Sequence, residues 1–330
     1  MTARMKTVEH LIPNGAGWLL ALTQSYDPDL LVTPRRPVLI VPGYGMNSFI
    51  FSFHPRGTSL ESFLVAQGFE VWRVDLRGSG NSIRQRGSDS FSLEDLALVD
   101  LKIAIDAALE RTRTTATRVD VIGASLGGSL VFIHAALHEA HRLGTIVAMG
   151  SPVRWVRIHP LVRAMFLSPM LIGLVRLKGT RRTAELALPL VARYTPWLLR
   201  VYMNPAASDV GAARQMVKTV EDPNRFINRQ IARWMRDRDL VVEGVNVSEQ
   251  LARLQMPLLC LAANGDGIVP LQTARFAYEQ IGSPEKGLLV VGTDQLALAH
   301  ADLFVSNEAL ELVFRPIADW LVRQADAVAA

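Results

Sequence analysis

Short apolar runs that suit strands alternate with longer segments of helical period along most of the chain. This alternation is typical of a βαβ architecture with a mainly parallel sheet. Strands are expected at 37–41, 69–75, 119–123, 144–149, 257–262 and 287–291, with a weaker N-terminal hairpin at 7–11 and 18–23. Helices are expected at 60–67, 93–111, 126–142, 271–280 and 308–325. The pattern therefore predicts an α/β fold, with a twisted sheet flanked by helices.

The alternation stops at Ser151 and resumes near Leu254. The segment between them contains helical, arginine-rich stretches with scattered aromatic residues and no clear strand. A loop of roughly a hundred residues does not fit inside a compact domain, so this segment is expected to have a structure of its own. We predict a core formed by residues 1–150 and 254–330, with a helical cap, 151–253, inserted after the sixth strand.

Charge is unevenly distributed around this predicted cap. The chain has 35 Lys and Arg against 31 Asp and Glu, but residues 151–240 hold 16 basic and 6 acidic residues. Such a basic segment suits a solvated helix face, peripheral contact with an anionic membrane, or an acyl-CoA-like substrate. No recognition motif favours nucleic acid as a partner. The oligomeric state stays open.

The high apolar content raises the question of a membrane segment. The chain is 49% hydrophobic, which excludes a disordered protein. Its most apolar stretch, 164–175, is interrupted by Ser168 and Pro169 and is too short to span a bilayer. The first ten residues lack the pattern of a charged region followed by an apolar region that a secretory signal has. We therefore expect a cytoplasmic location, with membrane contact that is peripheral if it occurs.

One G-x-S-x-G motif occurs in the chain, formed by Gly123, Ala124, Ser125, Leu126 and Gly127. The residues before it have the composition of a strand, and those after it suit a helix. A serine at such a turn has a strained backbone and projects its hydroxyl above the sheet edge. Glycines are needed at 123 and 127 because a Cβ there would collide with the neighbouring strand and helix. Ser125 is therefore the predicted nucleophile.

A serine hydroxyl needs a base to take its proton, and the base needs an acid to orient it. Of the seven histidines, His300 lies just beyond the last expected strand and is the predicted base. His134, His138 and His141 lie in the expected helix after the motif, spaced i, i+4 and i+7. No matching cysteine or carboxylate set accompanies these three, so a helix face at the core edge is expected rather than a metal site.

Asp266 is the predicted acid because it directly follows the expected strand 257–262. The carboxyl ends of parallel strands are where sites of α/β proteins are built. Asp294 and Asp302 compete for the role, since both are close to His300 in the sequence. The order Ser125, Asp266, His300 favours Asp266, because it matches the order of triads in this kind of fold.

Two backbone N–H groups are expected to stabilise the oxyanion formed during acyl transfer. Leu126 offers the first, at the N-terminus of the helix that follows the motif. Tyr44 is the best candidate for the second, because Gly43 and Gly45 on either side of it allow close backbone approach. A site of this kind requires no metal ion and no organic cofactor.

These motifs resemble the α/β-hydrolase superfamily, with the resemblance covering roughly residues 35–150 and 255–305. Residues 75–82, with the sequence DLRGSGNS, are similar to the D-x-R-G-x-G-x-S loop that is common there. The resemblance implies an α/β-hydrolase fold and acyl-transfer chemistry by a serine nucleophile.

Narrower resemblances point to two groups of that superfamily. Residues 59–72 and 91–106 resemble the acid-lipase family. The stretch 55–60 is similar to polyhydroxyalkanoate synthases, which carry a cysteine nucleophile where this chain has Ser125. Pro42 departs from the histidine that many members carry before the oxyanion glycine.

The predicted function is hydrolysis of a carboxylic ester through an acyl-enzyme. Apolar clusters in the expected cap favour an apolar acyl group, carried by a small molecule or a lipid; these clusters are 164–167, 170–172 and 197–199. Two alternatives remain. The same triad suits an acyltransferase or an enzyme resembling a polyester synthase or depolymerase, and a relative without catalysis would use the fold to bind a ligand.

Overall fold

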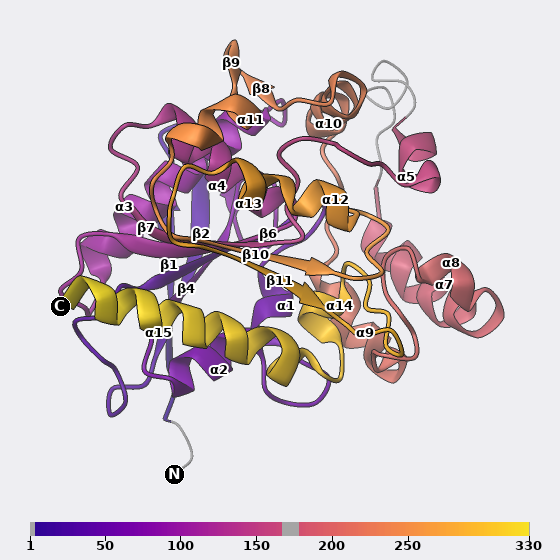
Figure 1. The fold of residues 1–330 in the computed structure, drawn as a ribbon, viewed down its shortest axis with the longest axis horizontal. Coiled ribbons are helices and arrows are strands. Elements are labelled where there is room, and N and C mark those ends of the chain that lie inside the picture. Colours follow the sequence, from indigo (N-terminus) through magenta and orange to yellow (C-terminus); the bar gives the residue numbers. More distant parts are fainter. Residues whose placement is uncertain (1–3, 167–177, 330) are drawn as a thin grey trace.

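The computed structural model of the chain describes residues 4–166 and 178–329 and shows a mixed sheet between two layers of helices (Figure 1). The sheet has nine strands in the order β1-β2-β4-β3-β6-β7-β10-β11, with β5 paired to β2. β2 is antiparallel to its neighbours, whereas the strands from β4 to β11 are parallel. The predicted α/β class and the mainly parallel sheet are confirmed. The strands are β1 (Lys6–Pro13), β2 (Trp18–Tyr26), β3 (Val38–Val41), β4 (Val71–Asp75), β5 (Ile83–Arg84), β6 (Val119–Ala124), β7 (Leu143–Met149), β10 (Leu258–Ala263) and β11 (Lys286–Val291).

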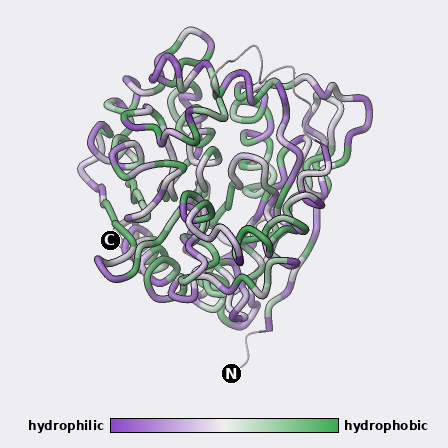
Figure 2. The backbone as a smooth tube through the Cα atoms, turned by 90° about the vertical axis from the view of Figure 1, so that its right-hand side faces the viewer, coloured by the Kyte–Doolittle hydropathy of each residue, from purple (hydrophilic) through white to green (hydrophobic). Residues whose placement is uncertain are grey.

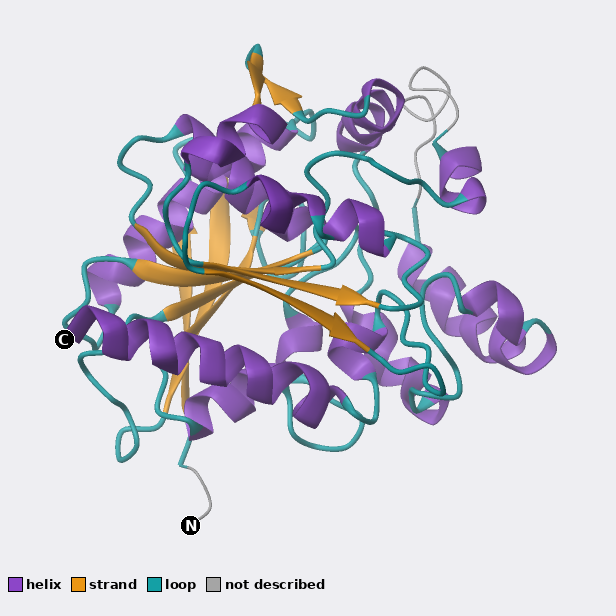
Figure 3. Ribbon diagram, in the orientation of Figure 1, coloured by secondary structure: helices purple, strands orange, loops and turns teal. Residues whose placement is uncertain are grey.

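The middle of the sheet is apolar because helices cover both of its faces (Figure 3). Every residue of β3, β6, β7 and β10 is buried. One core cluster includes residues of α3 (Leu101–Arg111), α4 (Leu126–Leu137), α11 (Val247–Gln250) and α13 (Phe276–Gln280). The other includes residues of α1 (Phe49–Ser52), α2 (Leu60–Ala66), α14 (Asp302–Val305) and α15 (Arg315–Ala329).

Four of the expected helices differ from the structure at their ends or in their interior. α4 ends at Leu137 rather than at 142, because the chain must turn through 138–142 to enter β7, with Arg142 at φ 56°. The helix expected at 271–280 consists of two short helices, α12 (Leu271–Ala274) and α13. The helices expected at 93–111 and 308–325 begin with π-helical turns, η1 (Asp95–Asp100) and η5 (Leu310–Phe314), before α3 and α15.

Between β7 and β10 the described part of the chain is mainly helical, and much of it lies beyond the carboxyl ends of β10 and β11 (Figure 1). Where this insertion divides from the core stays a prediction. Its helices and turns are α5 (Pro160–Met165), α7 (Thr180–Tyr194), α8 (Pro196–Leu199), η2 (Val210–Ala212), α9 (Ala213–Met216), η3 (Val217–Thr219), α10 (Arg225–Asp237), α11 and η4 (Leu251–Arg253).

The insertion also contains a two-stranded hairpin that the apolar pattern did not predict. β8 (Val241–Val242) pairs antiparallel with β9 (Val245–Asn246). Glu243 and Gly244 join them, both at positive φ, as a tight two-residue hairpin turn requires. Strands of two residues are too short to show a period of two in the sequence.

Some expectations fall on residues that the structure does not describe. The apolar cluster 170–172 and most of the stretch 164–175 lie outside the described residues. In the parts of the chain that are described, no helix is long and apolar enough to cross a membrane.

Candidate active site

Ser125 occupies the turn between β6 and α4, in a conformation that non-glycine residues rarely adopt, with φ 53° and ψ −121°. Two close approaches explain the glycines of the motif. A Cβ on Gly123 would collide with Gly128, and a Cβ on Gly127 would collide with the carbonyl of Val41 in the neighbouring strand. The sequence therefore has glycine where α4 approaches β6 and β3, and this approach leaves the serine at the sheet edge.

His300 and Asp266 form a buried pair at the carboxyl edge of the sheet. Nδ1 of His300 lies 2.7 Å from Oδ2 of Asp266. The other carboxylate oxygen of Asp266 accepts hydrogen bonds of 2.8 Å from the N–H groups of Ile268 and Val269. The Asp266 side chain is fully buried, so its carboxylate has a fixed position from which it orients the imidazole.

The two competing acids are placed differently. Asp294 is exposed in the loop after β11. Asp302 is buried and accepts hydrogen bonds from Ser208 Oγ at 2.6 Å, from Asn204 N at 2.8 Å and from Ala299 N at 2.7 Å. Burial raises the pKa of the Asp302 carboxyl. These contacts give Asp302 a structural task, in which it ties the His300 loop to the insertion.

Ser125 and His300 line one cavity of about 270 Å³, which we call the reaction cavity. In the described structure no hydrogen bond joins the Ser125 hydroxyl to His300; such bonds often tighten only when substrate binds. Most of the remaining wall is apolar, and much of it belongs to the insertion. The other lining residues are Tyr44, Met46, Leu126, Pro152, Trp155, Val162, Met165, Phe166, Tyr202, Ile231, Trp234, Met235, Ile268, Val269 and Phe304.

The backbone amides of Leu126 and Tyr44 are both available beside this cavity. Leu126 is the first residue of α4, and its N–H donates to no other group in the described structure. The N–H of Tyr44, in the loop after β3, is likewise unpaired among the described residues. A Cβ on Gly43 would lie 2.9 Å from Cβ of Ser125, so glycine permits the close approach of this loop to the serine.

The insertion fixes the loop that carries Tyr44. The N–H of Glu221 donates to Gly45 O at 2.8 Å, and the N–H of Asn47 donates to Thr219 O at 2.8 Å. The Tyr44 hydroxyl donates to Oδ1 of Asn228 in α10 at 2.6 Å. Burial raises the pKa of the Tyr44 phenol, which therefore stays protonated as a donor. These contacts join residues far apart in the sequence, and no pattern along the chain indicated them.

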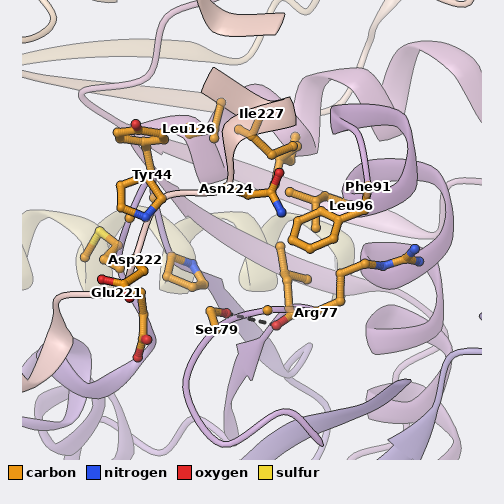
Figure 4. Close-up of a pocket in the computed structure, with 18 residues that line it drawn as sticks. Tyr44, Arg77, Ser79, Phe91, Leu96, Leu126, Glu221, Asp222, Asn224 and Ile227 are labelled. Atoms are coloured by element: carbon orange, nitrogen blue, oxygen red, sulfur yellow. Dashed lines mark hydrogen bonds between the residues drawn. The ribbon is translucent and has the colours of Figure 1, made fainter. Parts of the chain in front are cut away.

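A smaller cavity of about 70 Å³, drawn in Figure 4, adjoins the reaction cavity, and Tyr44, Met46 and Leu126 line both. The DLRGSGNS loop forms part of the wall of this smaller cavity, and its charged side chains make structural contacts. Asp75 accepts a hydrogen bond of 2.8 Å from Ser48 N, and Arg77 makes a two-pronged ion pair with buried Asp100. The motif thus supports the loop that carries Tyr44.

A second apolar cavity, also of about 270 Å³, lies next to the reaction cavity. Met46, Tyr202 and Phe304 line both and separate them. One side of α7 supplies much of the remaining wall, through Ala184, Ala187, Leu188 and Val191. A chain longer than the reaction cavity therefore has apolar space beside it.

Gly150 is a site residue that the sequence analysis missed. It follows β7 at φ 55°, and a Cβ there would lie 3.0 Å from Cε1 and 3.1 Å from Nδ1 of His300. Its position at the carboxyl end of an expected strand was the available signal. Met46, Tyr202 and Phe304 carried no such signal, because their role depends on packing between distant segments. Among residues 4–166 and 178–329, no group of three or more His, Cys, Asp or Glu side chains is arranged to hold a metal ion.

Comparison with curated proteins finds a set of bacterial esterases. The chain is 26% identical over 279 residues to the pimeloyl-(acyl-carrier protein) methyl ester esterase of Vibrio atlanticus, covering 82% of this chain and 92% of that protein. It is 27% identical over 244 residues to the protein of the same name from Vibrio cholerae, covering 72% and 79%.

Solved structures with the same fold include a lipase from Acinetobacter baumannii described as putative, with TM-score 0.62 and 15% identity over 98% of this chain and 93% of that one. An esterase from Rhodococcus also aligns with TM-score 0.62, at 17% identity over 96% and 98%. Residues 33–292 match the Hydrolase_4 family, described as serine aminopeptidase, S33. This chain is therefore a member of the Hydrolase_4 family of enzymes, within the α/β-hydrolase superfamily.

Proposed function

We propose that this protein is a serine hydrolase of carboxylic esters. Ser125 attacks the ester carbonyl while His300 takes the hydroxyl proton, and Asp266 holds the imidazole in the required orientation. His300 then gives the proton to the leaving alcohol. Water repeats the sequence on the acyl-enzyme, which releases the acid and regenerates Ser125. The N–H groups of Leu126 and Tyr44 stabilise the negative oxygen of each tetrahedral intermediate.

One observation carries this proposal: the strained Ser125 and the His300–Asp266 pair meet at a single cavity. Phosphonylation by a fluorophosphonate probe tests it. The probe should modify Ser125, identified by mass spectrometry of the labelled peptide, and Ser125→Ala should lose both labelling and ester hydrolysis. A folded Ser125→Ala protein that keeps more than about a tenth of the wild-type turnover would contradict the assignment, since triad knockouts cost up to about 10⁶ in kcat.

The apolar walls favour an acyl group that is itself apolar. The reaction cavity receives the carbonyl, and the second cavity behind Met46, Tyr202 and Phe304 receives a longer chain. The names of the curated relatives place their ester on an acyl group carried by a protein, which is compatible with an acyl chain that enters such a cavity. A lipid or small-molecule ester therefore remains our proposed substrate class. A cytoplasmic location stays a prediction.

A further inference from the structure

The outer side of α7 and α8 exposes large apolar side chains that a globular protein normally buries. Leu186, Leu190, Tyr194, Trp197 and Leu198 are 42–74% exposed. The first three are four residues apart and therefore share one side of α7. Trp197 and Leu198 follow directly in α8, which packs against α7. Single exposed apolar residues are common, but a contiguous group of this size marks a contact surface.

Cationic side chains flank this apolar group. Arg182 and Arg193 lie on the same side of α7 as Leu186, and Arg200 follows α8. All three are exposed and form no ion pair within the described structure, and the Arg193 guanidinium lies 5.5 Å from the centre of the Tyr194 ring. Residues 178–200 contain five basic residues and one acidic residue, Glu185. The surface is therefore both apolar and positively charged.

We propose that this α7–α8 surface, formed by Leu186, Leu190, Tyr194, Trp197 and Leu198 with Arg182, Arg193 and Arg200, binds the surface of an anionic lipid bilayer. Leucine side chains enter the acyl region of a membrane interface, tyrosine and tryptophan lie at the headgroup level, and arginine pairs with lipid phosphate. All three types are present here on one convex edge of the molecule. Figure 2 faces the side that carries α5, α7 and α8, where hydrophobic and hydrophilic residues are mixed along the backbone.

The α7–α8 surface lies close to the second apolar cavity. The opposite side of α7 lines the second apolar cavity, so one helix separates the proposed bilayer surface from that cavity, which adjoins the reaction cavity. A bilayer bound at this edge would therefore hold lipid esters close to the second cavity. The inference concerns binding and is tested without hydrolysis, so its failure is distinguishable from failure of the proposed activity.

Vesicle flotation of the full chain tests the proposal. Wild-type protein should bind vesicles of phosphatidylcholine mixed with phosphatidylglycerol, and binding to phosphatidylcholine alone should be much weaker. The double variant Arg182→Gln/Arg193→Gln should bind the anionic vesicles about 30-fold more weakly, which corresponds to about 1 kcal/mol for each arginine. High salt should weaken the wild-type binding, because it screens the attraction. Leu190→Ser/Trp197→Ser should reduce binding at both salt concentrations.

Two control variants carry the same kinds of substitution outside the α7–α8 surface. Arg118→Gln/Arg253→Gln removes two exposed arginines, and Leu11→Ser/Ile83→Ser removes two exposed apolar side chains on β1 and β5. Both controls should bind vesicles as the wild type does, and all variants should keep hydrolysis of a soluble ester. Absence of vesicle binding by the wild type, or equal loss in the controls, would overturn the proposal. The proposal would also be overturned if the protein did not bind vesicles but self-associated, or bound an acidic carrier protein, in a manner that depends on Trp197.

Discussion

Nδ1 of His300 lies 2.7 Å from Oδ2 of Asp266, although the two are 34 positions apart in the sequence. The parallel pairing of β10 and β11 creates this contact, because it places Ala263 beside Val291 and brings the loops after the two strands together. The second carboxylate oxygen of Asp266 is held by two backbone N–H groups, so the contact is rigid. This relationship distinguishes Asp266 from the other carboxylates near His300.

We expect Asp266→Asn to lower kcat by up to about 10⁴, because an amide favours the wrong imidazole tautomer; this magnitude is the one known for a protease triad. Asp302→Asn should instead destabilise the fold by about 1–3 kcal/mol, since it disturbs three hydrogen bonds of a buried carboxylate. Steady-state kinetics and urea unfolding of both variants separate these effects. A larger kcat loss in folded Asp302→Asn than in Asp266→Asn would transfer the acid role to Asp302.

Gly150→Ala should displace the His300 imidazole, because its methyl group would lie 3.0 Å from Cε1 of the ring. A displacement of about 1 Å at a catalytic group costs on the order of 10² in rate. Gly244→Ala is the matched control, since Gly244 also has positive φ, at 78°, but a Cβ there meets no atom within 4 Å. Both variants should lose similar backbone stability, measured by unfolding. Equal kcat values for the two would show that Gly150 does not constrain His300.

Filling the second cavity should change chain-length preference. A wild-type series of p-nitrophenyl esters should favour decanoate over acetate, because each buried methylene contributes about 0.8 kcal/mol. Ala187→Trp should lower kcat/KM for decanoate by up to about a hundredfold and leave butyrate unchanged, since Ala187 lines the second cavity. Leu186→Trp, on the outer side of the same helix, should leave the series unaltered. A wild-type preference for acetate would refute the apolar acyl site.

His134 should make the fold less stable in mild acid. Burial, with a smaller effect of His138, lowers the pKa of His134 to about 4 from its ordinary value of 6.5. Between these pH values the unfolded chain takes up a proton that the native state refuses, so the unfolding free energy falls as the pH falls. The expected loss at pH 5 is about 2 kcal/mol relative to pH 7.

Asp120 opposes this trend, since burial raises the pKa of its carboxyl to about 6 and native protonation then adds stability as the pH falls. The quantity to measure is therefore the difference in unfolding free energy between wild type and His134→Gln, obtained by urea unfolding at pH 7 and at pH 5. The contribution of Asp120 cancels in this difference because both proteins contain it. A pH-independent difference between them would show that the pKa of His134 is the same in the native and the unfolded state.

Local steric demands made much of the candidate site predictable from the sequence. The helix after Ser125 packs so closely on the neighbouring strands that only glycine fits at 123 and 127. The G-x-S-x-G motif, with a strand before it and a helix after it, therefore identified Ser125 as the nucleophile candidate. Continuous apolar runs predicted the central strands, because a sheet covered on both faces buries every residue of such strands. Asp266 and His300 were then assigned because each lies in a loop just after an expected strand.

Contacts between distant segments were decided only by the tertiary structure. The sequence favoured Asp266 over Asp294 and Asp302, but only the pairing of β10 with β11 brings its carboxylate against His300. The bonds that fix the Tyr44 loop come from the insertion, whose segments have no fixed spacing from that loop. One side of α7 lines a cavity and the other is exposed, which no pattern along the chain had indicated. Periodicity shows which residues share a side of a helix, but what lies opposite that side depends on the packing of the whole chain.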